Sequence, residues 1–387
     1  MSVFAARLPV LSPLLLAATL FSLVYTAFAI ARVLAFARKR PRPFGGPPVT
    51  VLKPLRGAEP GLYENLRSFC EQDYPVFQVV FGVRDAHDPA IALAERVMRD
   101  LPGHDLALVV NDRVIGANLK VSNLANMYGA AKHDLLVIAD SDMRVDRTYL
   151  GSVVGPLLDP AVGVVTCPYA GCSVGGLWAA LGAMFINEWF LPSVLVARAF
   201  RPDRFCFGST MAVRREALEA IGGFAALAPY LADDYMLGVF MNRRGLRVAL
   251  SPYVAETTVW EPDLRTLFTH QLRWARTIRT AQPLGHAMSF VTFSLVVSTA
   301  YLLVSSASIL GTVVVGGALA LRLGIHYAVR ASLPLREPAR PWLVPLLDAL
   351  CFVVWAASFW GRTVQWGGRT FAVASDGRMS ANGGHGS

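Results

Sequence analysis

The sequence predicts an α/β domain with a largely parallel sheet, placed between transmembrane helices. Hydrophobic residues make up 54% of the chain and charged residues only 16%, against about 25% charged residues in typical soluble domains. The longest apolar runs lie near the two ends of the chain. Between them, short strand-like runs alternate with amphipathic stretches, and this alternation is typical of parallel strands joined by helices.

The first apolar run extends from Leu8 to Phe36 and is longer than the roughly 20 residues that span a bilayer. A cleaved signal peptide is the alternative, but this run is too long for one and lacks the usual charged start. Four basic residues follow the run: Arg38, Lys39, Arg40 and Arg42. Because basic residues mark the cytoplasmic flank, we expect residues 1–48 to form a transmembrane helix and a basic, proline-rich linker.

The middle of the chain carries the strand-like runs. Five apolar runs are expected to be strands: Val49–Leu52, Gln78–Val83, Leu106–Val110, Leu135–Ala139 and Val162–Cys167. We expect residues 49–284 to form one α/β domain around them. Near its end, Leu264 to Ile278 places arginines among Leu, Phe and Trp, which suits an amphipathic helix at a membrane surface.

The apolar pattern returns after this domain. Met288 to Tyr327 is long enough for two closely spaced membrane helices, and Trp342 to Trp360 for a third. Three arginines crowd the connection before the last helix and favour its cytoplasmic placement: Arg330, Arg336 and Arg340. Residues 285–366 are therefore expected to hold C-terminal transmembrane helices, and the Gly- and Ser-rich residues 367–387 a flexible tail.

The charge balance indicates a lipid surface rather than nucleic acid. The chain has 36 Lys and Arg against 27 Asp and Glu, a net charge of +9. Much of the excess lies beside the apolar runs and no nucleic-acid motif competes, so we expect the lipid bilayer, and no nucleic acid, as a partner. The five cysteines include no Cys-x-x-Cys pair, which predicts reduced thiols in a cytoplasmic compartment.

An Asp-x-Asp pair ends the apolar run Leu135–Ala139 and is the strongest candidate for a functional site. Asp140 and Asp142 follow a run that is typical of a buried parallel strand. Ligands bind beyond the carboxyl ends of such strands, and carboxylates there suit a divalent cation that also holds substrate phosphates. The alternative for an isolated pair of this kind is a solvated turn.

Two further acidic positions lie at the ends of other predicted elements. Asp85 and Asp88 follow the run Gln78–Val83 and could accept hydrogen bonds from a uracil imide or a ribose hydroxyl. Asp233 and Asp234 are adjacent carboxylates, and such a pair can raise one pKa and create a general base. For both positions the alternative is a helix cap, which Asp88-Pro89 also suits.

The predicted amphipathic helix contains the last candidate, His270-Gln271-Leu272-Arg273-Trp274. Arg273 offers planar, bidentate recognition of a phosphate, and Trp274 offers a flat face for a sugar or a lipid. The alternative is an ordinary interfacial helix with no part in the chemistry.

The order and spacing of these positions resemble a membrane-bound family 2-type glycosyltransferase. Five segments resemble ceramide glucosyltransferases more closely: Leu52–Gly57, Phe69–Pro75, Asp88–Ile91, Asn118–Asn123 and Gly208–Arg214. Two more look like the glycosyltransferase of bacterial hopanoid biosynthesis, a related family 2/21-type enzyme: Asn187–Arg198 and Ala232–Tyr235. The resemblance covers Val49 to Leu284 and the flanking helices, and the motifs are specific when taken together.

The resemblance implies a GT-A-like, Rossmann-like domain on the cytoplasmic side of a bacterial inner membrane, in a multi-pass protein. It implies a nucleotide-sugar pocket formed by these residues: Lys53, Pro54, Leu55, Asp85, Asp88, Lys120, Asp140 and Ser141. Asp140 and Asp142 would bridge the diphosphate through Mg²⁺ or Mn²⁺. Asp234 would be the base, with Asp233 beside it, and Arg273 and Trp274 would close over diphosphate and acceptor.

The chain departs from the family pattern at one place, because His270 stands where Gln or Arg begins the usual Gln-x-x-Arg-Trp motif. The resemblance implies an inverting, metal-dependent transfer from UDP-N-acetylglucosamine to bacteriohopanetetrol. The alternative is a ceramide glucosyltransferase that uses UDP-glucose. A non-catalytic membrane transporter or scaffold is the alternative of another class, and the concentration of ionisable residues in the middle of the chain opposes it.

Overall fold

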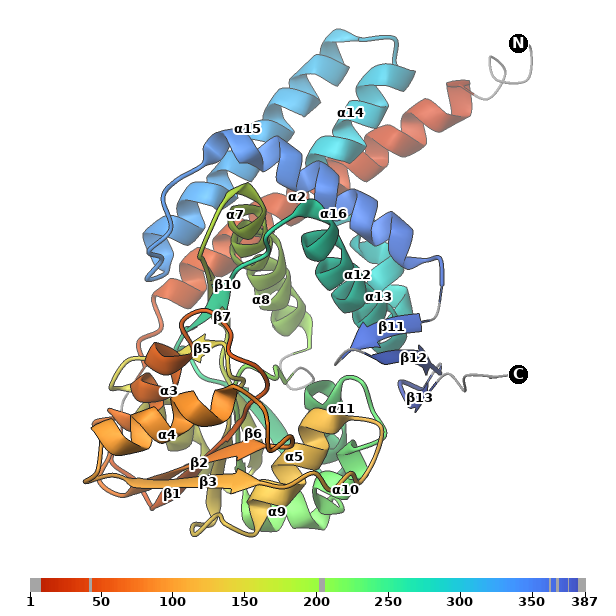
Figure 1. Cartoon of the computed structure of the whole chain (residues 1–387). Coiled ribbons are helices and arrows are strands. Elements are labelled where there is room, and N and C mark those ends of the chain that lie inside the picture. The colour runs from red at the N-terminus through yellow and green to blue at the C-terminus, as the bar shows by residue number, and fades with distance from the viewer. Residues whose placement is uncertain are drawn as a thin grey trace, which may run out of the picture. The chain divides into compact units, whose positions relative to one another are not determined.

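The computed structural model describes residues 8–41, 44–201, 206–361, 363–366, 369–374 and 376–381. Arg42 and Pro43 of the predicted linker lie outside the described residues. Two compact units are present (Figure 1). The sheet unit comprises residues 39–170, 198–260 and 362–387, and the helical unit comprises residues 1–38, 171–197 and 261–361. This division does not test the predicted domain boundaries, which stay predictions.

The sheet unit contains a seven-stranded sheet in the order β3-β2-β1-β4-β8-β6-β9. Its strands are β1 (Val49–Pro54), β2 (Phe77–Val83), β3 (Asp105–Val110), β4 (Leu135–Ile138), β6 (Val162–Thr166), β8 (Met211–Arg214) and β9 (Arg247–Leu250). Only β8 runs antiparallel to its neighbours in this sheet. The five predicted strands and the largely parallel sheet are therefore confirmed. The sequence did not reveal β8 and β9, because each has only four residues and an arginine at one end.

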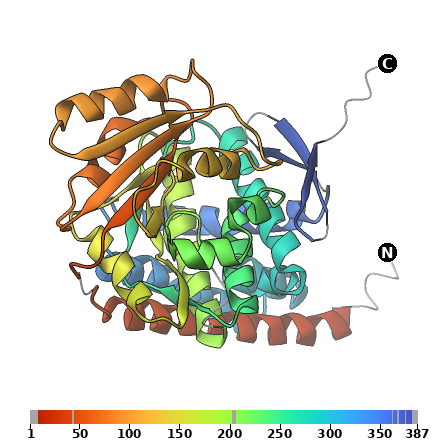
Figure 2. The same ribbon diagram turned by 90° about the horizontal axis from the view of Figure 1, so that it is seen from below.

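Helices cover both faces of this sheet. Val51 and Val79 share a core cluster with α3 (Leu62–Cys70), α4 (Ala90–Asp100) and α6 (Tyr149–Val154). Leu52 and Val80 share another with α5 (Leu119–Tyr128), α9 (Arg215–Ala220), α10 (Gly223–Leu227) and α11 (Asp233–Arg243). Figure 2 shows α4, in orange, beside strands β1–β3. Because successive strand residues face opposite sides, burial of both faces explains the continuous apolar runs.

The carboxyl ends of β1, β2 and β4 lie along one edge of the sheet. Val49 of β1 pairs with Phe77 of β2 on one side and with Leu135 of β4 on the other, both in parallel register. The short strand β5 (Met143–Arg144) follows β4 and pairs antiparallel with β10 (Ala255–Val259). This arrangement gathers the loops after β1, β2 and β4 at one edge, as expected for a ligand site in such a sheet.

The C-terminal residues form three strands: β11 (Thr363–Trp366), β12 (Arg369–Val373) and β13 (Met379–Ala381). Val364, Phe371 and Met379 are buried and pack with Ala117 and Leu231. The backbone N–H of Leu231 also donates to Gly377 O over 3.2 Å. The prediction of a flexible tail is wrong for 369–374 and 376–381, because it weighed Gly and Ser content and missed the spaced apolar residues. Residues 367, 368, 375 and 382–387 lie outside the described part.

The helical unit is built from apolar helices. In it α2 (Leu8–Ala37), α14 (Ser294–Val304) and α15 (Ile309–Ser332) pack against one another, and α12 (Leu264–Ala281) packs against α16 (Val344–Ser358). The predicted helices in Met288–Tyr327 and Trp342–Trp360 are confirmed as helices. Shorter elements connect them: α13 (Pro283–Met288), η3 (Ser289–Thr292) and η4 (Pro341–Leu343). A bend of 66° separates Pro283–Thr292 from Ser294–Val304.

Among the described residues, four helices are long and apolar enough to cross a membrane: Leu11–Ala37, Leu177–Phe200, Ile309–Ser332 and Pro341–Ser358. The second was not predicted as a helix of this kind. It comprises α7 (Leu177–Met184), the π-helix η2 (Phe185–Phe190) and α8 (Leu191–Phe200). In its apolar window 83% of residues are buried within the protein, against 22% for Leu11–Ala37. Most of this helix is therefore buried, which explains why it is apolar on several sides.

Candidate active site

Asp140, Ser141 and Asp142 follow β4 at the edge of the sheet where β1 and β2 also end. Asp142 Oδ2 accepts a hydrogen bond of 2.8 Å from Thr257 Oγ1 of β10. Burial raises the pKa of Asp142, and the negative charge of Asp140 raises it further. The two carboxylates thus repel each other in a partly buried place, and a nearby cation would relieve the repulsion.

Lys53 supports this loop from inside the sheet. It lies near the end of β1 and is fully buried, with Nζ 3.8 Å from the centroid of the Phe69 ring. Its Nζ donates a hydrogen bond to the backbone oxygen of Asp140. Burial lowers the pKa of Lys53 to about 7, although Asp142 and Asp140 oppose the shift. Lys53 therefore fixes the backbone of the Asp-x-Asp pair rather than standing open to solvent.

Glu59 is a site residue that sequence reasoning missed. It follows the Leu52–Gly57 motif, and Ser141 Oγ donates to its Oε2 over 3.5 Å. Burial and the charge of Asp142 raise the pKa of Glu59 to about 7. The signal in the sequence was its place in the loop after β1, at the same sheet edge as Asp140. A third carboxyl group therefore faces the Asp-x-Asp loop.

The donor set fits a divalent metal of the Mg²⁺ or Mn²⁺ type. Such ions are held in enzymes of phosphate chemistry by one or two carboxylates, with water and substrate phosphate completing the shell. Asp140 and Asp142 supply two carboxylates on a partly exposed loop. No group of three or more His, Cys, Asp or Glu side chains within the described ranges is arranged to hold a metal alone. Asp140 and Asp142 would therefore share the ion with the substrate.

Lys120 connects the Asp-x-Asp loop to the start of α11. Its Nζ lies 2.5 Å from Asp140 Oδ1 and 3.9 Å from Asp233 Oδ2. Burial alone would lower the pKa of Lys120, but Asp140 and Asp233 together raise it above its usual value. A charged ammonium group thus bridges the predicted metal-binding acid and the predicted base pair.

Asn118 holds the same two elements through hydrogen bonds. Its side-chain oxygen caps α5 by accepting from Val121 N over 3.1 Å. Its Nδ2 donates to Tyr230 O over 2.9 Å and to Asp233 Oδ1 over 3.3 Å. The motif that contains Asn118 and Lys120 was recognised in the sequence, but the positioning role of Asn118 was not. The contact depends on the approach of α5 to α11, which the sequence does not show.

Asp234 is held beside Gly208, just before β8. The N–H of Gly208 donates to Asp234 Oδ2 over 2.7 Å. Burial and the charge of Asp233 raise the pKa of Asp234 to about 6, while Lys120 opposes the shift. Burial also raises the pKa of Asp233, again against Lys120. The pKa of both aspartates is therefore raised, and the role of Asp234 as the base stays a prediction.

Gly208 is the point at which these groups meet. A methyl group in place of its hydrogen would lie 3.3 Å from Asp234 Oδ2, 3.3 Å from Lys120 Nζ and 3.6 Å from Asp140 Oδ2. The structure therefore brings Asp140 and Asp234, 94 positions apart in the sequence, close to the same glycine. We call the whole group the acidic edge: Glu59, Asp140, Asp142, Asp233 and Asp234, with Lys53 and Lys120.

Asp85 and Asp88 lie in the loop after β2 and are already engaged with backbone amides. Both oxygens of Asp88 accept from Gly57 N, over 2.8 and 3.0 Å, and one also accepts from Ala90 N over 2.9 Å. Asp85 is exposed and accepts from His87 N over 2.9 Å. Asp88 therefore joins the loops after β1 and β2 and accepts from the first backbone N–H of α4, although Pro89 and not Asp88 holds the N-cap position of that helix. Its contact with a nucleotide stays a prediction.

Arg273 and Trp274 lie on α12, in the helical unit. The Trp274 ring packs edge-on with His270 at 5.2 Å and contacts Phe185 at 5.9 Å. His270 Nδ1 lies 2.9 Å from Glu261 Oε1, so the residue that breaks the family pattern has an acidic partner. The roles predicted for Arg273 and Trp274 are not tested by this geometry and stay predictions.

Comparison with known families identifies the class. Residues 14–379 match the family described as glycosyl transferase family 21, and the chain belongs to this family. The predicted class of enzyme, a glycosyltransferase, is thereby confirmed at the level of the family. The match covers the acidic edge and the apolar helices together.

Ceramide glucosyltransferases are among the relatives of known name. Ceramide glucosyltransferase 1 of Caenorhabditis elegans is 27% identical over 232 residues, which cover 59% of this chain and 49% of the relative. Ceramide glucosyltransferase of Komagataella phaffii is 38% identical over 101 residues, which cover 25% of this chain and 20% of the relative. The matched part of this chain thus spans about half the length of the C. elegans relative and about a fifth of the K. phaffii relative.

A solved structure supports the fold. The mannosyltransferase PcManGT of Pyrobaculum calidifontis, solved with GDP-Man and Mn²⁺, aligns with a TM-score of 0.53 and 20% identity. The alignment covers 90% of this chain and 99% of that protein. The predicted GT-A-like fold is confirmed by this likeness. The apolar helices and the ceramide glucosyltransferase relatives together indicate a membrane protein.

Proposed function

We propose that this chain transfers a sugar from a nucleotide diphosphate sugar to a hydroxyl group of a membrane lipid, with inversion. The observation that carries the proposal is the meeting of Asp140, Lys120 and Asp234 around Gly208. A reaction of this kind needs neutralisation of charge on the leaving diphosphate and a base on the acceptor side. The acidic edge offers groups for both tasks within one small region.

The leaving diphosphate gains negative charge as the glycosidic bond to the sugar breaks. Asp140 and Asp142 would hold Mg²⁺ or Mn²⁺, which neutralises part of that charge when it is bound. The reported presence of Mn²⁺ in the mannosyltransferase of similar fold supports this assignment. Lys120 adds a positive charge at the same place, and Lys53 keeps the loop of Asp140 in position. Ser141, Pro54 and Leu55 keep their predicted place in the donor pocket.

Asp234 takes the proton of the acceptor hydroxyl. Its pKa of about 6 leaves the carboxylate ionised near neutral pH but more basic than an ordinary aspartate. The hydrogen bond from Gly208 N fixes one oxygen, and Asp233 beside it keeps the pKa raised. A single displacement with this base gives inversion at the sugar carbon. Arg273 and Trp274 keep their predicted roles toward diphosphate and acceptor, and Asp85 and Asp88 theirs toward the nucleotide.

We place ceramide first as the acceptor, with UDP-glucose as the proposed donor. Both relatives described above carry the name ceramide glucosyltransferase. The sequence first favoured bacteriohopanetetrol and UDP-N-acetylglucosamine, on the strength of Asn187–Arg198 and Ala232–Tyr235. We keep that pair as the second candidate, because those two segments still single it out. In both cases the acceptor is a lipid alcohol, and the site would face the cytoplasm of a bacterial inner membrane.

The test uses the purified chain in detergent with Mn²⁺ or Mg²⁺. UDP-glucose and UDP-N-acetylglucosamine are each offered with ceramide and with bacteriohopanetetrol, and products are identified by mass. Glucosylceramide formed only with metal supports the first candidate. Transfer of N-acetylglucosamine to the hopanoid supports the second. No transfer in any pairing, from protein that melts cooperatively and binds a UDP-sugar, contradicts the proposal and favours a non-catalytic membrane protein.

A further inference from the structure

Four ionisable side chains of the helical unit are almost completely buried and contact one another. Their exposed fractions are 2% for Glu188, 3% for Arg322 and 0% for both His326 and Asp348. We call them the buried ionic cluster. Charged groups in an apolar environment are costly, so inside membrane helices they are functional candidates whose partners must be identified.

Most polar atoms of this cluster have partners. His326 Nδ1 lies 2.7 Å from Glu188 Oε1, and Arg322 Nε lies 3.1 Å from Asp348 Oδ1. Asp348 Oδ2 also accepts from Leu295 N over 3.1 Å at the start of α14. These contacts involve one oxygen of Glu188, both oxygens of Asp348 and Nδ1 of His326. In these contacts the other oxygen of Glu188 and part of the Arg322 guanidinium have no partner.

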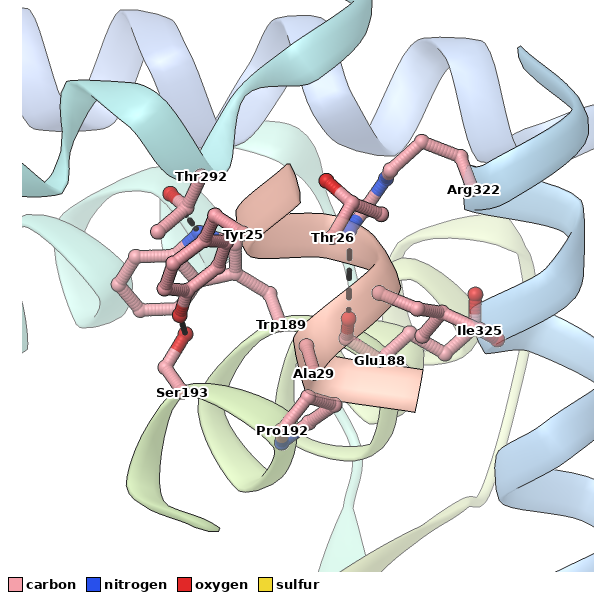
Figure 3. Close-up of a pocket in the computed structure, with 10 residues that line it drawn as sticks. All are labelled: Tyr25, Thr26, Ala29, Glu188, Trp189, Pro192, Ser193, Thr292, Arg322 and Ile325. Carbon is pink, nitrogen blue, oxygen red and sulfur yellow. Dashed lines mark hydrogen bonds between the residues drawn. The ribbon is translucent and has the colours of Figure 1, made fainter. Parts of the chain in front are cut away.

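Four buried polar atoms of the cluster lack hydrogen-bond partners within the described residues: Glu188 Oε2, Arg322 Nε and NH2, and Asp348 Oδ1. Arg322 Nε and Asp348 Oδ1 lie 3.1 Å apart as an ion pair. Of the four atoms, Glu188 Oε2, an acceptor, and the terminal NH2 nitrogen of Arg322, a donor, are the two outside that contact. Both side chains line a cavity formed by α2, η2, α8, η3 and α15, all in the helical unit (Figure 3). The π-helical turn η2, Phe185–Phe190, contains Glu188, and such turns often occur at functional sites.

The walls of the cavity are fixed by their own contacts. Trp189 Nε1 donates to Thr292 Oγ1 over 2.9 Å, and its ring stacks on Phe293 at 6.0 Å. Tyr25 OH donates to Ser193 Oγ over 3.2 Å. Because these polar groups already have partners, they do not compete for the atoms left over on Glu188 and Arg322. The cavity has room for about one water-sized group.

We propose that this cavity binds the hydroxyl group of a membrane lipid alcohol. A hydroxyl can donate to Glu188 Oε2 and accept from Arg322 at the same time, and it has the size of a water molecule. A phosphate or a sugar is too large for the cavity. Tyr25 and Trp189 of its lining are only half-buried, and the lipid body would lie along them. That this lipid is also the acceptor of the sugar rests on the proposed function; binding of the lipid hydroxyl does not.

The test compares two lipids on the unchanged protein. One is a long-chain alcohol that carries a diazirine, and the other is the methyl ether of the same molecule, which cannot donate a hydrogen bond. Each is cross-linked by light to the full chain in detergent, and labelled peptides are identified by mass. We expect the alcohol to label α2 and η2–α8 about tenfold more than the ether, as losing a hydrogen bond to a charged group predicts. Equal labelling overturns the proposal and leaves water as the occupant.

A pair of variants on α2 tests the position. Ala29 is fully buried at the cavity, whereas Ala27 is exposed two positions away. Ala29→Val fills the space and keeps every polar group, so labelling by the alcohol should fall about tenfold, and Ala27→Val should leave it unchanged. Equal labelling of the two variants overturns the proposal. Glu188→Gln provides a second check, because it should reduce the preference for alcohol over ether.

Failure of this proposal and failure of the proposed function give different results. If the alcohol labels the protein more than the ether does, but no lipid receives a sugar, the lipid site is supported and the transferase is contradicted. If sugar is transferred but alcohol and ether label equally, the lipid site is contradicted and the transferase is still supported. Equal melting temperatures of the three variants and the parent protein exclude misfolding as the cause of any difference.

Discussion

The acidic edge and the buried ionic cluster use the same residue types in opposite ways. At the acidic edge, five carboxyl groups gather around two lysines, and the pKa of Asp234 rises to about 6. In the buried ionic cluster, Glu188 and Asp348 each have one basic partner, and all four side chains are at most 3% exposed. One group has an excess of negative charge, and the other is paired residue by residue.

This difference indicates what each group can do. An unbalanced set of carboxylates at a strand edge is stabilised by an added cation, so it is suited to a metal and a charged substrate. A paired set in an apolar place cannot take up a further ion without large cost, but it can still exchange single hydrogen bonds. This contrast leads to four predictions. The opposite result in any of the four experiments would argue against the contrast between the two groups.

The largest effect is expected from Asp140→Asn. Removing one of the two metal-binding carboxylates should lower turnover about 1000-fold, because several kcal/mol of charge stabilisation are lost. Steady-state transfer with Mn²⁺ measures it. Asp134→Asn is the matched control, since Asp134 lies just before the same strand but is 93% exposed and forms an ion pair with Arg215. If Asp140→Asn kept more than a tenth of the activity, the excess of negative charge would not serve a metal.

Asp348→Leu should mainly affect stability. It leaves Arg322 as a buried charge without its acid, which costs about 3 kcal/mol or more of the free energy of unfolding. Chemical unfolding in detergent measures the loss. The double variant Asp348→Leu with Arg322→Leu should recover most of it, because two apolar side chains replace the pair. A double variant no more stable than the single one would show that the pair is not the unit that matters.

The pH dependence of transfer should reflect Asp234. Its carboxylate must be ionised to accept a proton, so kcat/KM should be constant at high pH and fall about tenfold per pH unit below pH 6. Initial rates from pH 4.5 to 8.5, about two units either side of the midpoint, define the curve. Glu59→Gln is the control, because burial raises the pKa of Glu59 to about 7. Loss of the acid limb in Glu59→Gln would assign that limb to Glu59 instead.

The smallest effect is expected at Asn118, and two substitutions separate its roles. Asn118→Ser keeps a side-chain oxygen that can cap α5 but removes the amide that donates to Asp233. Asn118→Ser should leave the free energy of unfolding unchanged. It should lower turnover about fivefold, because the loss of one hydrogen bond of about 1 kcal/mol corresponds to that factor. Asn118→Ala should also lose about 1 kcal/mol of stability with the cap. Equal turnover in Asn118→Ser and the parent would mean that Asp233 needs no such support.

The residues of the acidic edge and of the buried ionic cluster could not be predicted equally well from the sequence. Asp140 and Asp142 follow an apolar run, so their place at a strand end could be predicted from local pattern alone. Glu59, Asn118 and Gly208 gain their roles only from contacts between α5, α11 and the loops after β1 and before β8. Glu188 was part of a recognised segment, but nothing local indicates that it meets His326, 138 positions further on.

The sequence by itself determined the apolar helices at both ends, five strands of a largely parallel sheet and the order of the acidic positions. These depend on periodicity and on residues next to one another in the chain, which a sequence displays directly. Tertiary structure decided that most of the helix Leu177–Phe200 is buried, that Arg369–Val373 and Met379–Ala381 form strands, and that Asp140 and Asp234 meet at Gly208. These depend on which surfaces cover one another, because burial and charge repulsion are set by neighbours distant in sequence.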